Sequence, residues 1–375
     1  MFKQNIEKTI NRNVLLNPGP ATTSARVKSA LIVPDICPRE QEFGDLLGVV
    51  KNKALQVVSA DARYKAVLIG GSGTAAIEAC LSSCTNDKAV LILENGAYGE
   101  RMKKICDALK IPADVIKTNW GDPIDQKTVK DHLEKNASKY HVMAFIHHET
   151  TVGILNDLCS LHQLAKQYKL KTLVDAMSSY AGLEINLTKD DVDYLVSSSN
   201  KCIQGMAGLG ICIVKEQVLN EIAQYPKRSF YLDLSTNYSS QEKNNQFAFT
   251  PPVQILYALN EAFDEFFEAG GTTARAGRYE ELYQQMKSGM LELGFECLVP
   301  EHLQAKILTA FRWPDNSNFS FEEMHDYLYL KGITIYPGKN AKEKSFRISN
   351  IGELNSEDIS FFLENLKSFL KTKRH

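Results

Sequence analysis

Between Tyr64 and Val214 the chain alternates short apolar runs with longer stretches whose apolar positions recur every three or four residues. The runs "AVLIL" (89–93) and "VMAFI" (142–146) are continuously hydrophobic, as strands buried on both faces require. Stretches such as "ERMKKICDALK" (100–110) have helical spacing instead. Because right-handed crossovers return each strand beside an earlier one, this alternation predicts a mainly parallel α/β sheet with helices on both faces.

The pattern changes after "FTPPVQILYALNEAFDEFFEAGG" (249–271). A long amphipathic helix is predicted around Thr273–Leu293, and Asn355 or Ser356 is expected to cap a last helix. Between them, β-rich runs lie near 305–313, 333–338 and 345–352, and helical patterns near 320–332 and 355–371. This mixture predicts a smaller α+β domain. We therefore expect an N-terminal arm (1–14), a large domain (15–265) and a small C-terminal domain (266–375).

Composition narrows the classes of partner. The formal net charge is -2, so the chain has no basic excess of the kind that dominates nucleic-acid binding. No apolar run approaches the roughly 20 residues that a membrane span needs, and the first residues are polar. The eight cysteines contain no CxxC pair, so we expect mostly buried thiols and no metal site. These features favour small-molecule substrates, with no nucleic acid or membrane partner, and a cytoplasmic location.

A glycine-rich turn, "GGSGTAAIEA" (70–79), follows one predicted strand and opens a helix. Its amide N–H groups and the hydroxyls of Ser72 and Thr74 converge at the positive end of the helix dipole, which suits a phosphate group. Gly71-Ser72-Gly73 also begins a GxGxxA pattern, and Glu94 follows about 20 residues later, as in dinucleotide folds. The turn alone therefore leaves three alternatives: a cofactor phosphate, an NAD-dependent oxidoreductase, or a plain tight turn.

Two further residues favour the first alternative. Asp175 is predicted at the carboxyl end of one strand, and Lys201 follows the next strand-like run, "VDYLVSSSN" (192–200). Adjacent strand ends bring a carboxylate and an amine to one crevice, with the phosphate turn at a third strand end. Pyridoxal 5′-phosphate needs all three groups: an amine for its aldehyde, a carboxylate for its protonated pyridine nitrogen, and a phosphate anchor. Singly, either residue fits a surface charge or a turn cap.

At these residues the chain resembles the class V aminotransferases, which are fold-type I pyridoxal-phosphate enzymes. The resemblance covers nearly the whole chain and rests on "LLNPGPATTSARVKSAL", "GGSGTAAIEA", "ENGAYGERM", "HHETTVGILND", "VDAMSSYAG", "SSSNKCIQGMAGLG", "FTPPVQILYAL" and "FRISNIGE". It implies a mainly parallel seven-stranded-type sheet in the large domain, a smaller α+β domain, and a homodimer with shared active sites. Within the class, the motifs are most similar to the subgroup that transfers the amino group of 2-aminoethylphosphonate to pyruvate, giving phosphonoacetaldehyde and L-alanine.

The resemblance assigns the catalytic groups and the phosphate site. It implies that Lys201 binds the cofactor aldehyde covalently and that Asp175 pairs with the pyridine nitrogen. Ser72, Gly73 and Thr74 match the residues that hold the phosphate.

The resemblance also assigns residues around the ring and the substrate. Tyr98 matches the aromatic residue that stacks on the ring, Thr150 the hydroxyl near its O3′ atom, and Asn200 a residue lining the pocket. Thr250 matches a residue that reaches the phosphate of the neighbouring subunit, and Arg347 matches the substrate-binding arginine. Without the resemblance, Tyr98 is only an aromatic at a helix start, Thr250 precedes a helix, and Arg347 is an exposed strand arginine.

Some residues depart from the subgroup. Asn17, His148 and Val152 stand where Thr, Cys and Thr are common, and we expect them near the substrate. They leave open an alanine–glyoxylate or serine–glyoxylate type of aminotransferase. Cysteine desulfurases carry histidines where this chain has Tyr98 and Asn200, which disfavours that activity. A non-catalytic relative remains a further alternative.

Overall fold

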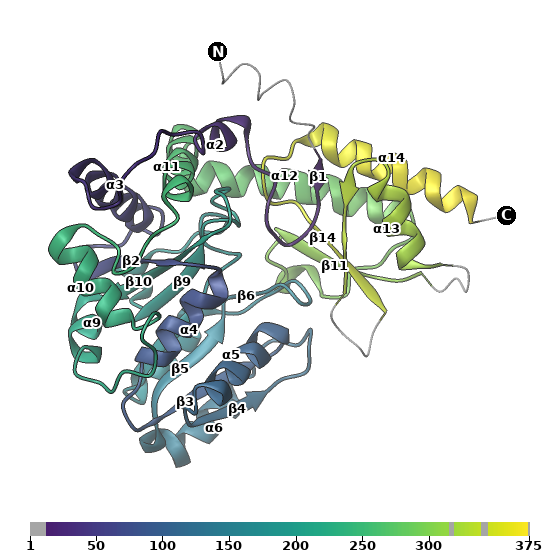
Figure 1. Cartoon of the computed structure of the whole chain (residues 1–375). Helices are drawn as coiled ribbons and strands as arrows, with labels where there is room; N and C mark the ends of the chain where they lie inside the picture. Colours follow the sequence, from purple (N-terminus) through teal and green to yellow (C-terminus); the bar gives the residue numbers. More distant parts are fainter. Residues whose placement is uncertain (1–12, 315–318, 339–343, 374–375) are drawn as a thin grey trace.

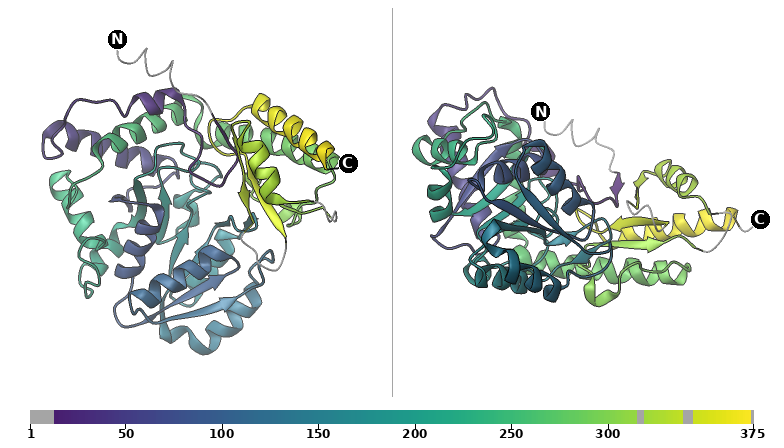
Figure 2. Two further views of the ribbon diagram at one scale, coloured as in Figure 1. Left: turned by 45° about the vertical axis from the view of Figure 1, so that its right-hand side comes forward. Right: turned by 90° about the horizontal axis from the view of Figure 1, so that it is seen from below.

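The computed structural model describes residues 13–314, 319–338 and 344–373. Most of the predicted N-terminal arm, residues 1–12, lies outside the described residues. Figure 1 shows a central sheet covered by helices, with a smaller lobe of strands and helices built largely from the C-terminal third of the chain. Both views in Figure 2 place this smaller lobe, drawn in light green and yellow, beside the sheet-containing lobe.

The large domain is built on one seven-stranded sheet in the order β2-β10-β9-β8-β5-β3-β4. Its strands are β2 (Tyr64–Gly70), β3 (Ala89–Glu94), β4 (Ala113–Lys117), β5 (Tyr140–Ile146), β8 (Lys171–Asp175), β9 (Tyr194–Ser198) and β10 (Leu209–Lys215). The prediction of a mainly parallel sheet is confirmed. The sequence analysis missed β10, which is antiparallel to both of its neighbours. Only residues 199–208 separate it from β9, a connection too short for a parallel crossover.

Helices cover both faces of this sheet (Figure 1). Alternate residues of β2 explain why: Ala66 and Leu68 pack into one hydrophobic core, whereas Val67 and Ile69 pack into another. The helices of this domain are α2 (Ala25–Ser29), α3 (Gln41–Gln56), α4 (Gly73–Ser83), α5 (Ala97–Ala108), α6 (Gln126–Asn136), α7 (Leu158–Gln167), α8 (Leu187–Asp190), α9 (Glu216–Ile222), α10 (Leu234–Asn244) and α11 (Val253–Glu268), with a short 3-10 helix η1 (Ala137–Lys139).

The small domain contains a three-stranded antiparallel sheet in the order β11-β14-β13, a short parallel pair, and helices on one side. The elements are α12 (Gly271–Glu292), η2 (Glu301–Leu303), β11 (Leu308–Arg312), α13 (Phe321–Tyr329), β12 (Ile333–Thr334), β13 (Tyr336–Pro337), β14 (Ser345–Ser349) and α14 (Ser356–Thr372). Asn355 caps α14, and the side chain of Asp358 bonds back to the Asn355 backbone in a capping box. The α+β character of this domain agrees with the sequence prediction.

Two segments connect the domains. The N-terminal strand β1 (Val14–Leu15) pairs in parallel with β12, and Val14 and Leu16 belong to the small-domain core. Helix α12 contributes Tyr279 to the large-domain core and Leu282 to the small-domain core. The domain boundaries given by the sequence analysis stay predictions. These contacts show that the small domain contains residues from the N-terminal part of the chain as well as from its C-terminal third.

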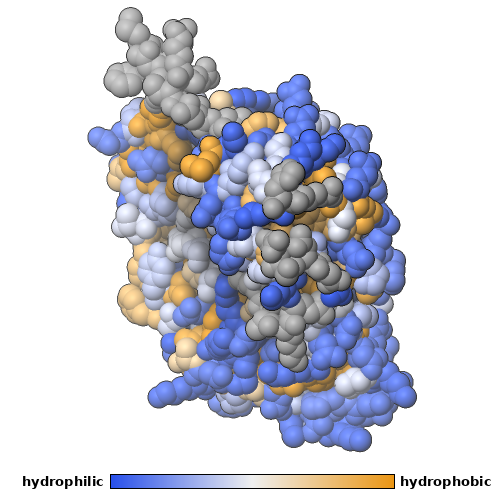
Figure 3. All heavy atoms as spheres, turned by 90° about the vertical axis from the view of Figure 1, so that its right-hand side faces the viewer, coloured by the Kyte–Doolittle hydropathy of each residue, from blue (hydrophilic) through white to orange (hydrophobic). Residues whose placement is uncertain are grey.

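The surface is mixed in character. The face in Figure 3, which is the right-hand side of Figure 1, is mainly hydrophilic, with hydrophobic areas between the polar ones. Among the described helices, none combines the length and apolarity needed to cross a bilayer. Most of the cysteines are buried free thiols, as expected, although Cys37 and Cys159 are exposed.

Candidate active site

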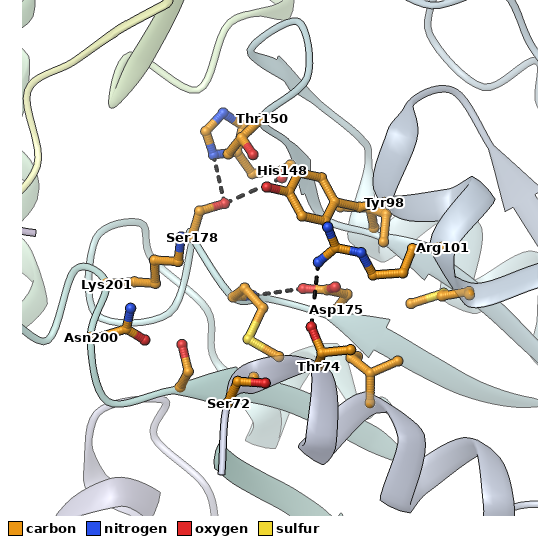
Figure 4. A pocket seen from close by; sticks show the side chains of 16 residues that line it. Ser72, Thr74, Tyr98, Arg101, His148, Thr150, Asp175, Ser178, Asn200 and Lys201 are labelled. Atoms are coloured by element: carbon orange, nitrogen blue, oxygen red, sulfur yellow. Dashed lines mark hydrogen bonds between the residues drawn. The ribbon is translucent and has the colours of Figure 1, made fainter. Parts of the chain in front are cut away.

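A cavity of about 190 Å³ lies at the carboxyl edge of the large sheet. Figure 4 shows side chains entering it from the start of α4, from α5 and from the segments that follow β5, β8 and β9. Eight of the ten residues that the sequence analysis assigned to the cofactor or substrate line it: Ser72, Gly73, Thr74, Tyr98, Thr150, Asp175, Asn200 and Lys201. The fold thus brings together groups that are up to 129 positions apart in the chain (Ser72 to Lys201).

The glycine turn forms one wall of the cavity. Gly71 has φ +141°, which favours glycine, and its N–H donates a hydrogen bond to the carbonyl oxygen of Gly208 at 2.8 Å. Ser72 is the N-cap residue of α4, yet its hydroxyl makes no capping bond with the described backbone of that helix. A Cβ atom on Gly73 would lie 2.4 Å from the Met177 Sδ atom. The turn therefore presents N–H groups, hydroxyls and a close backbone approach, which together suit a phosphate group.

Asp175 ends β8 at the floor of the cavity. Its carboxyl group is buried, and its Oδ1 atom accepts a hydrogen bond from the Met177 N–H at 2.9 Å. Burial, with a smaller contribution from the nearby Glu149, raises the pKa of Asp175 to about 7 even though the Met177 N–H, Lys201 and Arg101 oppose the shift. Because burial makes the carboxylate of Asp175 costly, a cationic group bound beside it inside the cavity would stabilise its charged form.

Lys201 lies just beyond β9, on the opposite side of the cavity opening from Tyr98 in Figure 4. Its Nζ atom donates a hydrogen bond to the carbonyl oxygen of Pro18 at 2.6 Å. Burial lowers the pKa of Lys201. A lysine that loses its proton easily is a better nucleophile than an exposed one, and arginine cannot replace it in this respect.

Tyr98 lies in the first turn of α5, next to the buried carboxylate of Glu149, which the sequence analysis did not single out. The Tyr98 N–H donates to the Oε2 atom of Glu149 at 3.1 Å, and the Thr151 N–H donates to its Oε1 atom at 2.9 Å. Burial raises the pKa of Glu149, and the bonds from Thr151 and Tyr98 oppose that shift. A Cβ on Gly96 would lie 2.2 Å from the Glu149 side chain, so glycine is needed there.

Arg347 reaches the rim of the site from β14 of the small domain. Its Nη1 atom donates to the carbonyl oxygen of Thr150, and its Nε atom to that of Pro337, each at 3.1 Å. Its guanidinium also bonds to the side chain of Tyr98, and burial lowers its pKa. Because Arg347 is only 2% exposed, the alternative of an exposed strand arginine is wrong.

Thr250 was predicted to reach the cofactor phosphate of the neighbouring subunit, and this role stays a prediction. It is exposed, precedes Pro251 at the start of α11, and is absent from the described lining of the cavity. Beside it, the ring of Phe249 contacts those of Phe230 and Tyr231, with centroid distances of 5.5 and 4.9 Å. Phe230 is 87% exposed. This exposed aromatic surface lies next to Thr250, which is expected to act across a subunit boundary.

Several lining residues were missed or misjudged from sequence. Arg101, Ser178 and Ser198 line the cavity but were not singled out. His148 lines it as expected; its Nδ1 atom lies 3.0 Å from Ser178 Oγ, and burial lowers its pKa to about 3. Val152 was expected near the substrate, and this is wrong, because it packs in a separate apolar cluster.

The doubly covered sheet, the buried lysine and carboxyl group, and the glycine turn at one cavity define a pyridoxal-phosphate-dependent transferase of fold type I. The profile of the family "Aminotransferase class-V" matches residues 30–366, and the chain belongs to this family. Pyridoxal 5′-phosphate is therefore its cofactor. Family membership also favours a cofactor phosphate at Gly71-Ser72-Gly73 over the dinucleotide alternative.

Two relatives and one solved structure place the chain more closely. It is 36% identical over 365 residues to a 2-aminoethylphosphonate–pyruvate transaminase of Phocaeicola vulgatus, covering 96% of this chain and 99% of that protein. It is 35% identical over 363 residues to a bifunctional phosphonoacetaldehyde hydrolase/aminoethylphosphonate transaminase of Clostridioides difficile, covering 96% of this chain but 57% of that protein. A ureidoglycine–glyoxylate aminotransferase of Bacillus subtilis superposes with a TM-score of 0.90 at 22% identity, covering 98% and 95% of the two chains.

Proposed function

We propose that this protein transfers the amino group of 2-aminoethylphosphonate to pyruvate, giving phosphonoacetaldehyde and L-alanine. The observation that carries the proposal is the meeting of Lys201, Asp175 and the Ser72–Thr74 turn at one cavity, with the buried Arg347 at its rim. The relatives of known name support the choice of substrates, since they carry this activity in their names at 35% and 36% identity. The 22% identity to a glyoxylate aminotransferase supports the shared fold and does not favour the glyoxylate alternative.

The cavity fits the cofactor at three points. Ser72, Gly73 and Thr74 would hold its phosphate, Asp175 would face its pyridine nitrogen, and Lys201 would bind its aldehyde. When bound, the cofactor supplies a carbonyl group that accepts amines and a ring that withdraws electrons from the adjacent carbon. A Cβ on Gly73 would collide with Met177, so a side chain at this position would displace the turn that is to hold the phosphate.

Each residue contributes a specific step. Lys201 would hold the cofactor through its aldehyde, and its lowered pKa makes the Nζ atom easier to deprotonate, so the same amine could take a proton from the substrate carbon and give it back at the adjacent cofactor atom. Asp175, as a carboxylate, keeps the pyridine nitrogen protonated. Tyr98 offers a flat ring surface for stacking, and Thr150 and Asn200 orient the ring edge.

Arg347 would bind the acidic group of each substrate. Its guanidinium offers paired N–H donors that match a carboxylate or a phosphonate, so one residue can serve both half-reactions. Its position on β14 also links substrate binding to the small domain. Carbonyl oxygens of Thr150 and Pro337 hold two of its N–H groups, which fixes the direction of the remaining donors.

We further propose a homodimer with shared active sites, in the cytoplasm. Thr250 supports this arrangement because it is exposed and lies apart from the cavity of its own chain, next to the open aromatic surface of Phe230, Tyr231 and Phe249. Mixing Lys201→Ala with Thr250→Val, each of which should be impaired on its own, tests it. In a hybrid dimer, the site with an intact Lys201 receives an intact Thr250 from its partner, so activity reappears if the sites are shared. Absence of recovery in verified hybrids would contradict sharing.

The substrate assignment is tested by donor profiling with the purified protein. With pyruvate as acceptor, 2-aminoethylphosphonate should give equimolar phosphonoacetaldehyde and L-alanine, and should exceed alanine, serine and taurine as donor. Parallel reactions with glyoxylate as acceptor examine the alternative activity. A protein that binds pyridoxal 5′-phosphate but forms no phosphonoacetaldehyde would end the substrate proposal and leave the cofactor assignment intact.

A further inference from the structure

Arg101 occupies a position at the cavity that the assigned roles leave unexplained. It lies on α5, one helical turn beyond Tyr98, and lines the same cavity. Its Nη1 atom lies 3.4 Å from the Thr74 Oγ1 atom, and its guanidinium lies 4.7 Å from the centroid of the Tyr98 ring. Figure 4 shows the side chain extending from α5 toward Thr74 at the start of α4. Arg101 therefore bridges the ring-stacking residue and the glycine turn.

The charges of the side chains that line the cavity indicate a role for Arg101. Among the described residues that line it, the acidic and basic side chains other than His148, which burial keeps neutral, are Arg101, Asp175 and Lys201. Asp175 and Lys201 are taken up by the ring nitrogen and the aldehyde. The turn itself offers only neutral hydroxyl and N–H donors, whereas a phosphate monoester carries a charge of about −1.5 to −2 at neutral pH.

Arginine is suited to supply the missing charge. Its guanidinium stays protonated at all relevant pH values and donates paired N–H groups to phosphate oxygens. The guanidinium lies over the Tyr98 ring while its Nη1 atom contacts Thr74 Oγ1, so Tyr98 and Thr74 together position the group. The positive charge also reaches into the cavity, since Arg101 is among the groups that lower the pKa of Asp175.

We propose that Arg101 is the cation that binds the cofactor phosphate, opposite the N–H groups at the start of α4. The inference rests on the proposed assignment of Ser72–Thr74 to that phosphate. It also gives Tyr98 a second task, because one ring would then position both the cofactor and the arginine that neutralises it.

The test compares pyridoxal 5′-phosphate with pyridoxal, which has the same ring and aldehyde but no phosphate. The cofactor is removed from the full-length protein, and each compound is titrated back while the absorbance of the bound form is followed. Arg101→Gln should weaken binding of the phosphorylated compound by about 10- to 100-fold, as expected for the loss of a charge-assisted hydrogen bond. Pyridoxal affinity should change less than about twofold. Arg101→Lys, which keeps the charge, should lose less than Arg101→Gln.

Lys104→Gln is the matched control, since Lys104 lies on the same helix, is 70% exposed and pairs with Glu100. It should leave both affinities unchanged. Equal weakening of both compounds by Arg101→Gln would overturn the proposal, because the residue would then act only through Tyr98. Unchanged affinity for both would overturn it as well. If the unaltered protein bound the two compounds equally, the phosphate assignment of the turn would fail, a result distinct from any effect of Arg101.

Discussion

Lys201 donates a hydrogen bond from its Nζ atom to the carbonyl oxygen of Pro18, at a distance of 2.6 Å. The two residues are 183 positions apart in the sequence. A carbonyl oxygen accepts a hydrogen bond from either the charged or the neutral amine, so this contact orients Lys201 without fixing its charge. Burial then decides the protonation state, and it favours the neutral amine.

Replacing Lys201 by alanine should abolish transamination, with a loss of at least about 10³-fold, because the nucleophile and the proton carrier disappear together. The near-visible absorbance band of covalently bound cofactor should also disappear. Lys201→Arg is the matched variant: it keeps the positive charge but cannot lose its proton. Substantial activity in Lys201→Arg would show that charge alone is sufficient and would contradict the assigned role.

Replacing Gly19 by alanine should displace Lys201. A Cβ at this position would lie 2.4 Å from the Nζ atom of Lys201, and Gly19 has φ +124°. We expect slower covalent capture of the cofactor, measured by stopped-flow absorbance. Gly121→Ala separates the two causes, because Gly121 has φ +99° but nothing within 4 Å of its Cβ position. If both variants capture the cofactor at the same reduced rate, backbone strain and not the contact with Lys201 is responsible.

Asp175 gives the cofactor-free protein a characteristic dependence on pH. Its pKa is raised from 3.8 to about 7 in the folded chain, so the folded state binds more protons than the unfolded state in that interval. Stability should therefore fall as the pH rises from about 4 to 7, by up to roughly 4 kcal/mol for a difference of this size. Asp175→Asn should remove this dependence in thermal unfolding measured across the interval. An unchanged slope in that variant would exclude Asp175 as its source.

Asp175→Asn, which should remove a loss of stability from the cofactor-free protein, should lower activity once the cofactor is bound. A carboxylate is then needed to keep the pyridine nitrogen protonated, and asparagine cannot supply it. We expect Asp175→Asn to lower kcat by at least about 10²-fold while its cofactor-free form is as stable as the unaltered protein or more so at pH 8. Full activity in this variant would mean that the ring nitrogen is not charged during the reaction.

Gly73 is expected to be required for cofactor binding. Alanine there would place a Cβ atom 2.4 Å from Met177 Sδ and 3.2 Å from Ser198 Cβ. Equilibrium titration should show an affinity for pyridoxal 5′-phosphate reduced by about tenfold or more. Gly48→Ala is the control, since Gly48 lies inside α3 and has nothing within 4 Å of its Cβ position. That change should leave cofactor binding intact and stabilise the helix by about 0.5–1 kcal/mol.

Arg347→Lys should reduce kcat/KM for both substrates by about 10²-fold or more, because a point charge replaces the paired donors that match a carboxylate or phosphonate. The effect should appear mainly in KM for 2-aminoethylphosphonate and pyruvate, with the cofactor band unchanged. Arg312→Lys, on the neighbouring strand β11, provides the comparison. An equal loss in the two variants would point to a disturbed sheet and not to substrate binding.

Much of the site could be predicted from local patterns. Asp175 and Lys201 follow apolar runs, and parallel strands deliver their carboxyl ends to one edge, so their meeting follows from the alternation itself. The glycine turn was recognisable for the same reason. Functional residues at neighbouring ends of parallel strands can therefore be predicted from the sequence alone.

The remaining features depend on contacts that no local pattern encodes. The carbonyl oxygen of Pro18 accepts a hydrogen bond from Lys201, 183 positions away, and Glu149 accepts one from the Tyr98 N–H, 51 positions away. Arg101 belongs to an amphipathic helix whose exposed lysines look equivalent to it in sequence. Only the orientation of α5 beside α4 distinguishes the arginine that lines the cavity from the lysines that do not.

The segment from Leu16 to Ala21 is held by both domains at once. The Leu16 N–H donates to Thr334 of the small domain at 2.8 Å, and the Ala21 N–H donates to Asn200 of the large domain at 3.0 Å. Pro18, which contacts Lys201, lies between these two attachments. Any rotation of the small domain must therefore be absorbed within a few residues of backbone that touch the reactive amine. The position of that amine is in this way mechanically tied to the lobe that carries the substrate-binding arginine.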